Sequence, residues 1–205
     1  MHHKNILYRG KRLKEADKAL ILIHGRGGTA ESMLPLSVQL NLEGFAILLP
    51  QAERNTWYPF SFLMPVEKNE PWLSSALSLI ADIEHDVMQA GIPPEHLYIA
   101  GFSQGACLSL EFAARNAKKF GGVIAFTGGL IGDRIEESNY MGGFEQSPVF
   151  IGTSDPDPHV PVSRASESEK ILKNMQAMTH LHVYRNMGHV ISKEEIDTVN
   201  RLFFS

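Results

Sequence analysis

The sequence contains little cysteine, no excess of positive charge and no long apolar run. Cys107 is its single cysteine, so no internal disulfide can form, in agreement with a reducing compartment. The net charge of -4 provides no basic surface for nucleic acid or an anionic membrane. The apolar run at residues 19–23 is much shorter than a signal-peptide core or a membrane span. We therefore expect a cytoplasmic protein with no nucleic-acid partner and no stable membrane insertion.

The chain length and composition indicate one folding unit. The 205 residues are 43% hydrophobic, which is enough for one well-buried core and short for two. No internal repeat, low-complexity tract or linker rich in Pro, Gly and Ser interrupts the sequence. Residues 1–205 are therefore expected to form a single domain.

Short apolar segments alternate with longer amphipathic ones along the chain. The short segments have the continuous apolar character of parallel strands that are covered on both faces. They are residues 19–24, 45–49, 97–101, 122–126, 148–152 and 181–185. The amphipathic segments, predicted to be helices, are residues 32–42, 72–90, 104–117, 163–178 and 191–204. This pattern predicts an α/β domain with a mostly parallel sheet, helices on both faces and ligands at the carboxyl ends of the strands.

One predicted strand end carries a serine between two glycines. The stretch "LYIAGFSQGACLSL" contains G-x-S-x-G, with Ser103 between a buried strand and the helix that starts at Gln104. A serine on such a turn is strained and exposed, and the free N–H groups at the start of the helix favour negative charge beside it. A plain structural turn is the alternative. The position between strand and helix favours a nucleophile.

A serine nucleophile requires a base and a carboxylate, and both follow later in the chain. His189 comes directly after the last predicted strand, although a solvated loop histidine is the alternative interpretation. The segment "TSDPDPHVP" after the preceding strand offers Asp155 and Asp157, either of which alone could start an Asp-Pro turn. The order Ser, Asp, His is the one expected for a nucleophile on a strand-to-helix turn of this kind.

The glycine-rich loop "IHGRGGTAES" follows the first strong strand. It could cradle a phosphate, but it has neither the Lys-Ser/Thr of a P-loop nor the Rossmann spacing. In a hydrolase, the backbone N–H groups of Arg26 and Gln104 would bind the oxyanion of the tetrahedral intermediate. The Arg26 side chain need not take part.

The motifs together resemble the phospholipase/carboxylesterase branch of the α/β-hydrolases, which includes the acyl-protein thioesterases. The similarity covers nearly the whole chain and is carried by "LIHGRGG", "LPQAERNTWY", "GFSQGACLSL", "DPHVP" and "NMGH". It implies an α/β-hydrolase fold with Ser103 as nucleophile, His189 as base, Asp157 as acid, and Arg26 and Gln104 as oxyanion donors. Counting from Gly152 would instead place the acid at Asp155, so the choice of Asp157 depends on the D-P-x-V-P match.

The segment from Trp57 to Trp72 is rich in aromatics and prolines, and it has no charged residue before Glu67. It is predicted to line a pocket for an uncharged acyl chain or to form a partial lid, with Trp57 and Tyr58 binding substrate. A loop that only covers the core is the alternative.

Neither a metal nor a cofactor is expected. His180 and His182 would share one strand face, but no carboxylate or thiol cluster accompanies them. Cys107 is expected to pack in the core.

These observations favour a serine hydrolase that cleaves a small-molecule acyl ester or thioester through an acyl-enzyme. The alternative is a catalytically silent binding module on the same fold. Four points stay open: ester or thioester, the acyl chain length, a protein or a small-molecule substrate, and the oligomeric state.

Overall fold

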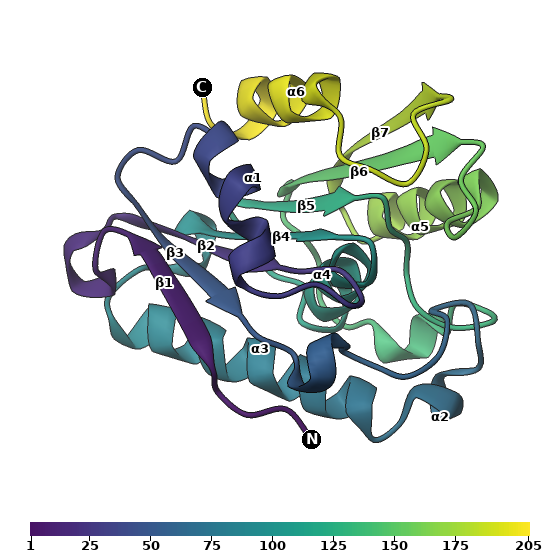
Figure 1. Ribbon diagram of the computed structural model, residues 1–205, viewed down its shortest axis with the longest axis horizontal. Coiled ribbons are helices and arrows are strands. Elements are labelled where there is room, and N and C mark those ends of the chain that lie inside the picture. The colour runs from purple at the N-terminus through teal and green to yellow at the C-terminus, as the bar shows by residue number, and fades with distance from the viewer.

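The computed structural model describes residues 1–205 and has a seven-stranded sheet at its centre (Figure 1). The strands lie in the order β1-β3-β2-β4-β5-β6-β7. All neighbours pair in parallel except β1 and β3. The strands are β1 Ile6–Gly10, β2 Lys18–Ile23, β3 Phe45–Pro50, β4 Leu97–Phe102, β5 Gly122–Phe126, β6 Pro148–Asp155 and β7 Met178–Arg185. The predicted mostly parallel sheet is confirmed.

Helices cover both faces of the sheet. They are α1 Leu34–Gln39, α2 Val66–Asn69, α3 Trp72–Gln89, α4 Gln104–Arg115, α5 Val162–Asn174 and α6 Lys193–Phe203. Figure 1 shows α6 above the sheet and α3 below it. None of these helices combines the length and the apolarity needed to cross a bilayer.

Two apolar cores lie against the two faces. The larger has 38 buried residues and joins the sheet to α3, α4 and α5, whereas the smaller has 18 and joins it to α1 and α6. Alternate residues of β2 enter different cores, with Ile21 and Ile23 in the larger and Leu20 and Leu22 in the smaller. Burial on both faces explains why the central strands read as continuous apolar runs.

The edges of the sheet differ from the sequence-based expectation. Strand β1 was not predicted, because an edge strand with three exposed residues in five lacks the continuous apolar pattern. Strand β7, the opposite edge, begins at Met178, inside the helix that was expected to reach that residue. Helix α5 ends at Asn174, and Gln176 has a φ of 66°, which a helix does not accommodate.

The parallel strands place their carboxyl ends along one edge of the sheet. The segments that follow β2, β3, β4, β6 and β7 contain the residues singled out from the sequence, in the order Arg26, Trp57 with Tyr58, Ser103, Asp157 and His189. The fold thus places residues from distant parts of the chain at one edge, as open α/β sheets do with their ligand sites.

Candidate active site

Ser103 occupies the sharp turn between β4 and α4. Its φ and ψ of 55° and -115° belong to a region that side-chain-bearing residues rarely adopt, at a cost of about 1–3 kcal/mol. The two flanking glycines allow the turn because main chains approach each other closely there. A Cβ on Gly101 would overlap the carbonyl group of Gly105, and one on Gly105 would overlap the carbonyl oxygen of Ile23 in β2. The serine hydroxyl is therefore held at the end of the strand by backbone contacts.

His189 lies in the loop after β7 and contacts the Ser103 hydroxyl. The distance from its Nε2 to Ser103 Oγ is 2.8 Å. The loop is fixed by Gly188, which has a φ of 75° and whose N–H donates to Ser154 Oγ at 2.9 Å. The imidazole is only 18% exposed, and its ring packs against Phe102 at a centroid distance of 5.2 Å.

Asp157 accepts the second hydrogen bond of this histidine. Its Oδ2 is 2.9 Å from His189 Nδ1, and its side chain has no exposed surface. Its Oδ1 accepts the backbone N–H groups of His159 at 2.7 Å and Val160 at 2.8 Å. Because an ionised carboxylate only accepts, Nδ1 carries the proton and Nε2 is free to accept from Ser103.

The charge of Asp157 is stabilised by these contacts. Burial raises the pKa of its carboxyl, but the His159 N–H, the His189 ring and the Val160 N–H outweigh burial, and the pKa lies below its ordinary value. Asp155, the other candidate, ends β6 with an exposed side chain, and its backbone carbonyl accepts the N–H of Asn186 at 2.9 Å. The structure brings Asp157, and not Asp155, to His189.

The two predicted oxyanion donors border the serine. The N–H of Arg26 has no acceptor in the protein, and Gln104 is the first residue of α4, where a helix leaves its N–H groups unpaired. Behind Arg26, the buried His24 fixes the loop: its Nδ1 donates to Gly25 O at 2.7 Å and its Nε2 accepts the Ala52 N–H at 3.1 Å. Burial lowers the pKa of His24, in agreement with a neutral ring in this position.

The side chains of Arg26 and Gln104 also hold the segment after β3, residues 57–72, in place. Gln104 Oε1 accepts the N–H of Trp57 and its Nε2 donates to Tyr58 O, both at 2.8 Å. The Arg26 guanidinium donates to Pro59 O at 2.8 Å and to Phe60 O at 2.5 Å. The Arg26 side chain, which is not needed to bind the oxyanion, thus anchors this segment.

A cavity of about 560 Å³ opens beside Ser103. Its wall contains the aromatic and aliphatic residues of the segment after β3, together with residues of the Ser103, Asp157 and His189 loops. The apolar and aromatic members are Tyr58, Phe60, Phe62, Leu63, Phe102 and Val160. The segment is thus not merely a cover for the core. Its one regular element is the short helix α2, where the sequence predicted none.

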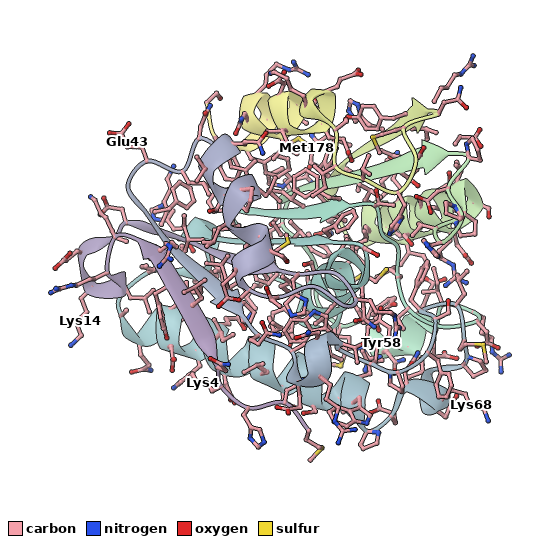
Figure 2. All side chains as sticks on the ribbon, in the orientation of Figure 1. Lys4, Lys14, Glu43, Tyr58, Lys68 and Met178 are labelled. Atoms are coloured by element: carbon pink, nitrogen blue, oxygen red, sulfur yellow. The ribbon has the colours of Figure 1, made fainter.

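Trp57 and Tyr58 do not have the same place in this site. Trp57 has no exposed surface and does not line the cavity; its Nε1 donates to His24 O at 2.8 Å, behind the Arg26 loop. The expectation that Trp57 contacts substrate needs correction, because its indole is used inside the protein. Tyr58 does line the cavity, although it is 1% exposed. Figure 2 shows Tyr58 among the packed interior side chains and Lys68 pointing outward from α2.

Cys107 packs in the core, as the sequence predicted. Cys107 is buried at the cavity wall, and burial raises the pKa of its thiol to about 12. His182 packs between Phe150 and Tyr184. No group of three or more His, Cys, Asp or Glu side chains is placed to hold a metal ion.

Two histidines of the site were missed from the sequence. His24 directly precedes the glycine-rich loop, and nothing in its local sequence pattern indicates a buried bridging ring. His159 lines the cavity with its ring edge against His189 at a centroid distance of 4.8 Å. The motif "DPHVP", which favours Asp157 over Asp155 as the acid, also contains His159 and could have indicated that this histidine lies near the site.

Known proteins share this architecture and much of the sequence. The crystal structure of a phospholipase/carboxylesterase from Dyadobacter fermentans superposes with a TM-score of 0.98 at 50% identity, covering 100% of this chain and 98% of the other. This similarity confirms the predicted α/β-hydrolase fold. Acyl-protein thioesterase 1 from Kluyveromyces lactis is 30% identical over 130 residues, 60% of this chain and 56% of the relative. Its counterpart from Debaryomyces hansenii is 26% identical over 216 residues, 91% of this chain and 90% of the relative.

The match to the curated thioesterases is partial in several cases. The chain spans about half the length of the Kluyveromyces lactis protein and of three further acyl-protein thioesterases. The profile of the phospholipase/carboxylesterase family, in contrast, matches residues 10–203. The chain belongs to the phospholipase/carboxylesterase family.

Proposed function

We propose that this protein is a serine hydrolase that cleaves carboxylic ester or thioester bonds through an acyl-enzyme. The observation that carries the proposal is the hydrogen-bonded chain from Ser103 Oγ through His189 to Asp157, with distances of 2.8 Å and 2.9 Å. An isolated serine is a weak nucleophile, and this arrangement supplies the base and the group that orients the base. Membership of an esterase family supports the same chemistry.

In the first half-reaction, Ser103 Oγ attacks the substrate carbonyl carbon while His189 Nε2 takes the hydroxyl proton. The negative charge that develops on the carbonyl oxygen is stabilised by the N–H groups of Arg26 and Gln104. Asp157 stabilises the imidazolium, which then gives its proton to the leaving oxygen or sulfur. The bond to the leaving group breaks, an alcohol or thiol departs, and the acyl group stays on Ser103.

In the second half-reaction, water replaces the leaving group. His189 takes a proton from the water, whose oxygen attacks the acyl carbon, and the same donors hold the second oxyanion. Return of the proton to Ser103 Oγ releases the carboxylic acid and restores the enzyme. The chain's own residues perform every proton transfer, so the proposal needs no cofactor.

The 560 Å³ cavity supports an uncharged acyl group as the substrate part next to Ser103. Its apolar wall favours burial of hydrocarbon, and charged groups would lose hydration there. Relatives named acyl-protein thioesterase support a thioester as well as an oxygen ester. We further propose that the substrate is a small molecule and that residues 1–205 form a single domain, which the chain length and composition support. The lone buried cysteine supports a cytoplasmic location for the reaction.

The test begins with a fluorophosphonate probe, which reacts with an activated serine and ignores an ordinary one. We expect labelling of the wild type at Ser103 and none of Ser103→Ala. Hydrolysis of p-nitrophenyl esters and acyl thioesters of graded chain length then separates the two bond types. A folded wild type that is neither labelled nor active on any substrate would refute the hydrolase proposal in favour of a silent binding module.

A further inference from the structure

A second cavity of about 470 Å³ lies on another side of the His189 ring. It shares four wall residues with the cavity beside Ser103, and neither Ser103 nor Gln104 belongs to its wall. The shared residues are Gly25, Arg26, Phe102 and His189. The remaining wall comes from α1 with the residues before it, and from α6 with the residues before it. The two cavities therefore meet at the catalytic ring and extend into different parts of the protein.

The walls of the second cavity are mostly apolar. Met33 and Leu36 contribute from the α1 side, and Val190, Ile191 and Ile196 from the α6 side. Hydrogen bonds hold the two elements together at one end, because Asn200 in α6 accepts the N–H of Asn41 at 2.8 Å and donates to the carbonyl oxygen of Gln39 at 2.9 Å. The cavity is thus formed before any ligand binds.

The polar wall residues already have partners inside the protein. Lys193 Nζ contacts both carboxylate oxygens of Asp197, at 2.6 Å and 2.8 Å. The Gln39 amide donates to Pro35 O at 3.1 Å, and the Ser32 hydroxyl donates to Thr29 O at 2.6 Å. The Arg26 guanidinium is held by the carbonyl groups of residues 59 and 60. The cavity consequently presents little unmet hydrogen-bonding capacity and suits hydrocarbon better than a charged or sugar-like group.

The reaction connects this cavity to one part of the substrate. His189 must deliver a proton to the leaving oxygen or sulfur, so the leaving group departs next to the imidazole. With the acyl group in the cavity beside Ser103, the second cavity is the available apolar volume along the exit direction. We infer that this cavity between α1 and α6 binds the apolar part of the leaving alcohol or thiol. The inference rests on the proposed hydrolase function and assigns a substrate class to it: esters with hydrocarbon on both sides of the scissile bond.

The kinetic parameter that reports this site is kcat/KM. It covers all steps up to release of the first product, during which the leaving group is still attached, whereas hydrolysis of the acyl-enzyme is common to all esters of one acid. Each buried methylene should raise kcat/KM by up to about fourfold. We expect hexyl butanoate to exceed methyl butanoate by at least about tenfold in kcat/KM, and S-hexyl butanethioate to exceed the S-methyl thioester likewise.

A pair of variants on α1 tests the location. Gln39 is exposed and lines the cavity, whereas its neighbour Val38 is 83% exposed and does not. Gln39→Trp should fill the cavity, lower kcat/KM for the hexyl ester by at least about fivefold and leave the methyl ester within about twofold. Val38→Trp adds the same indole to the same helix and should leave both esters within about twofold.

Val190→Asp provides a second variant that does not depend on an added ring. Val190 is half exposed, so a carboxylate is tolerated there while its charge disfavours hydrocarbon in the cavity. The hexyl-to-methyl ratio should fall in this variant too.

A wild-type hexyl-to-methyl ratio within about twofold of one, or a ratio unchanged in both Gln39→Trp and Val190→Asp, overturns the inference, and the proposed hydrolase function then stands on its own. If no ester is cleaved and the fluorophosphonate probe leaves Ser103 unlabelled, the proposed function fails, and this inference fails with it.

Discussion

Ser192 and Glu195 exchange hydrogen bonds at the start of α6. The N–H of Ser192 donates to Glu195 Oε2 and the N–H of Glu195 donates to Ser192 Oγ, both at 3.1 Å. The other carboxyl oxygen of Glu195, Oε1, is buried without a partner against Gly152 in β6. This capping box fixes the end of the loop that carries His189.

The pH dependence of stability should reveal the burial of Glu195. Burial raises the pKa of Glu195 from 4.5 to about 7, opposed by the Ser192 N–H and reinforced by Glu194. Because the folded protein holds this proton more tightly than the unfolded chain, the contribution of Glu195 to stability is greatest below about pH 4.5. It is lost as the pH rises to about 7, by on the order of 3 kcal/mol.

Glu195→Gln imitates the protonated acid at every pH. Compared with the wild type, it should raise Tm at pH 8 and change Tm little at pH 5, measured by thermal denaturation. Ser192→Ala removes the cap itself and should lower stability by about 1 kcal/mol at both pH values. A Glu195→Gln effect that is equal at the two pH values contradicts the assignment.

The backbone strain at Ser103 predicts a difference between two inactive variants. Ser103→Ala and Ser103→Gly both remove the proposed nucleophile and should retain less than about one percent of wild-type kcat. Glycine tolerates a φ of 55° with a ψ of -115°. The free energy of unfolding of Ser103→Gly should therefore exceed that of Ser103→Ala by about 1 kcal/mol, and Ser103→Gly should unfold at a higher denaturant concentration. Equal unfolding midpoints would argue against stored strain at this turn.

The two aspartates near the end of β6 should respond very differently to amide substitution. Asp157→Asn disturbs the acceptor of the His189 ring N–H, so kcat should fall by as much as about 10⁴. Asp155→Asn changes an exposed side chain without a contact to His189 and should keep nearly normal kcat. Steady-state kinetics on one p-nitrophenyl ester compares them directly, and an inactive Asp155→Asn with an active Asp157→Asn would reverse the assignment.

Trp57→Phe distinguishes support of the Arg26 loop from contact with substrate. Loss of the indole N–H leaves the carbonyl of His24 without its donor, which should lower kcat by about tenfold through displacement of the oxyanion loop. The reduction should be the same for short and long acyl chains, because Trp57 does not line the cavity. A changed preference for chain length, measured with p-nitrophenyl acetate, butanoate and octanoate, would instead indicate direct contact.

The fold was predictable where burial leaves a clear pattern in the sequence. Strands β2 to β5 are covered on both faces and read as apolar runs, and the long amphipathic α3 is recognisable by its periodicity. The edge strand β1 has three exposed residues among its five, so it lacks a continuous apolar run. It is held by pairing with β3, about 40 residues later in the chain, and the sequence around β1 gives no sign of that pairing. Local hydrophobic patterns therefore predicted the central strands of the sheet better than its edge strands.

The positions of the candidate site residues were predictable where chemistry requires a residue type at a fixed place in the fold. Ser103 and His189 follow strand ends, and the turn at Ser103 requires Gly101 and Gly105. Trp57 shows the limit of such reasoning: its aromatic ring suggested substrate contact, but its role depends on the carbonyl of His24, 33 residues earlier in the chain. Likewise, the second cavity arises where α1 meets α6, and no contiguous motif encodes that meeting.

The close approach of Gly105 to Ile23 fixes the position of Ser103 independently of the side chains that line the two cavities. Two main chains in van der Waals contact set the spacing between the start of α4 and the end of β2, and hence between Ser103 and the loop of Arg26. Side chains lining the two cavities can change size or polarity without entering that contact. Such a division lets the range of accepted substrates diverge among descendants of one ancestor while the geometry of the proposed catalytic residues is inherited unchanged.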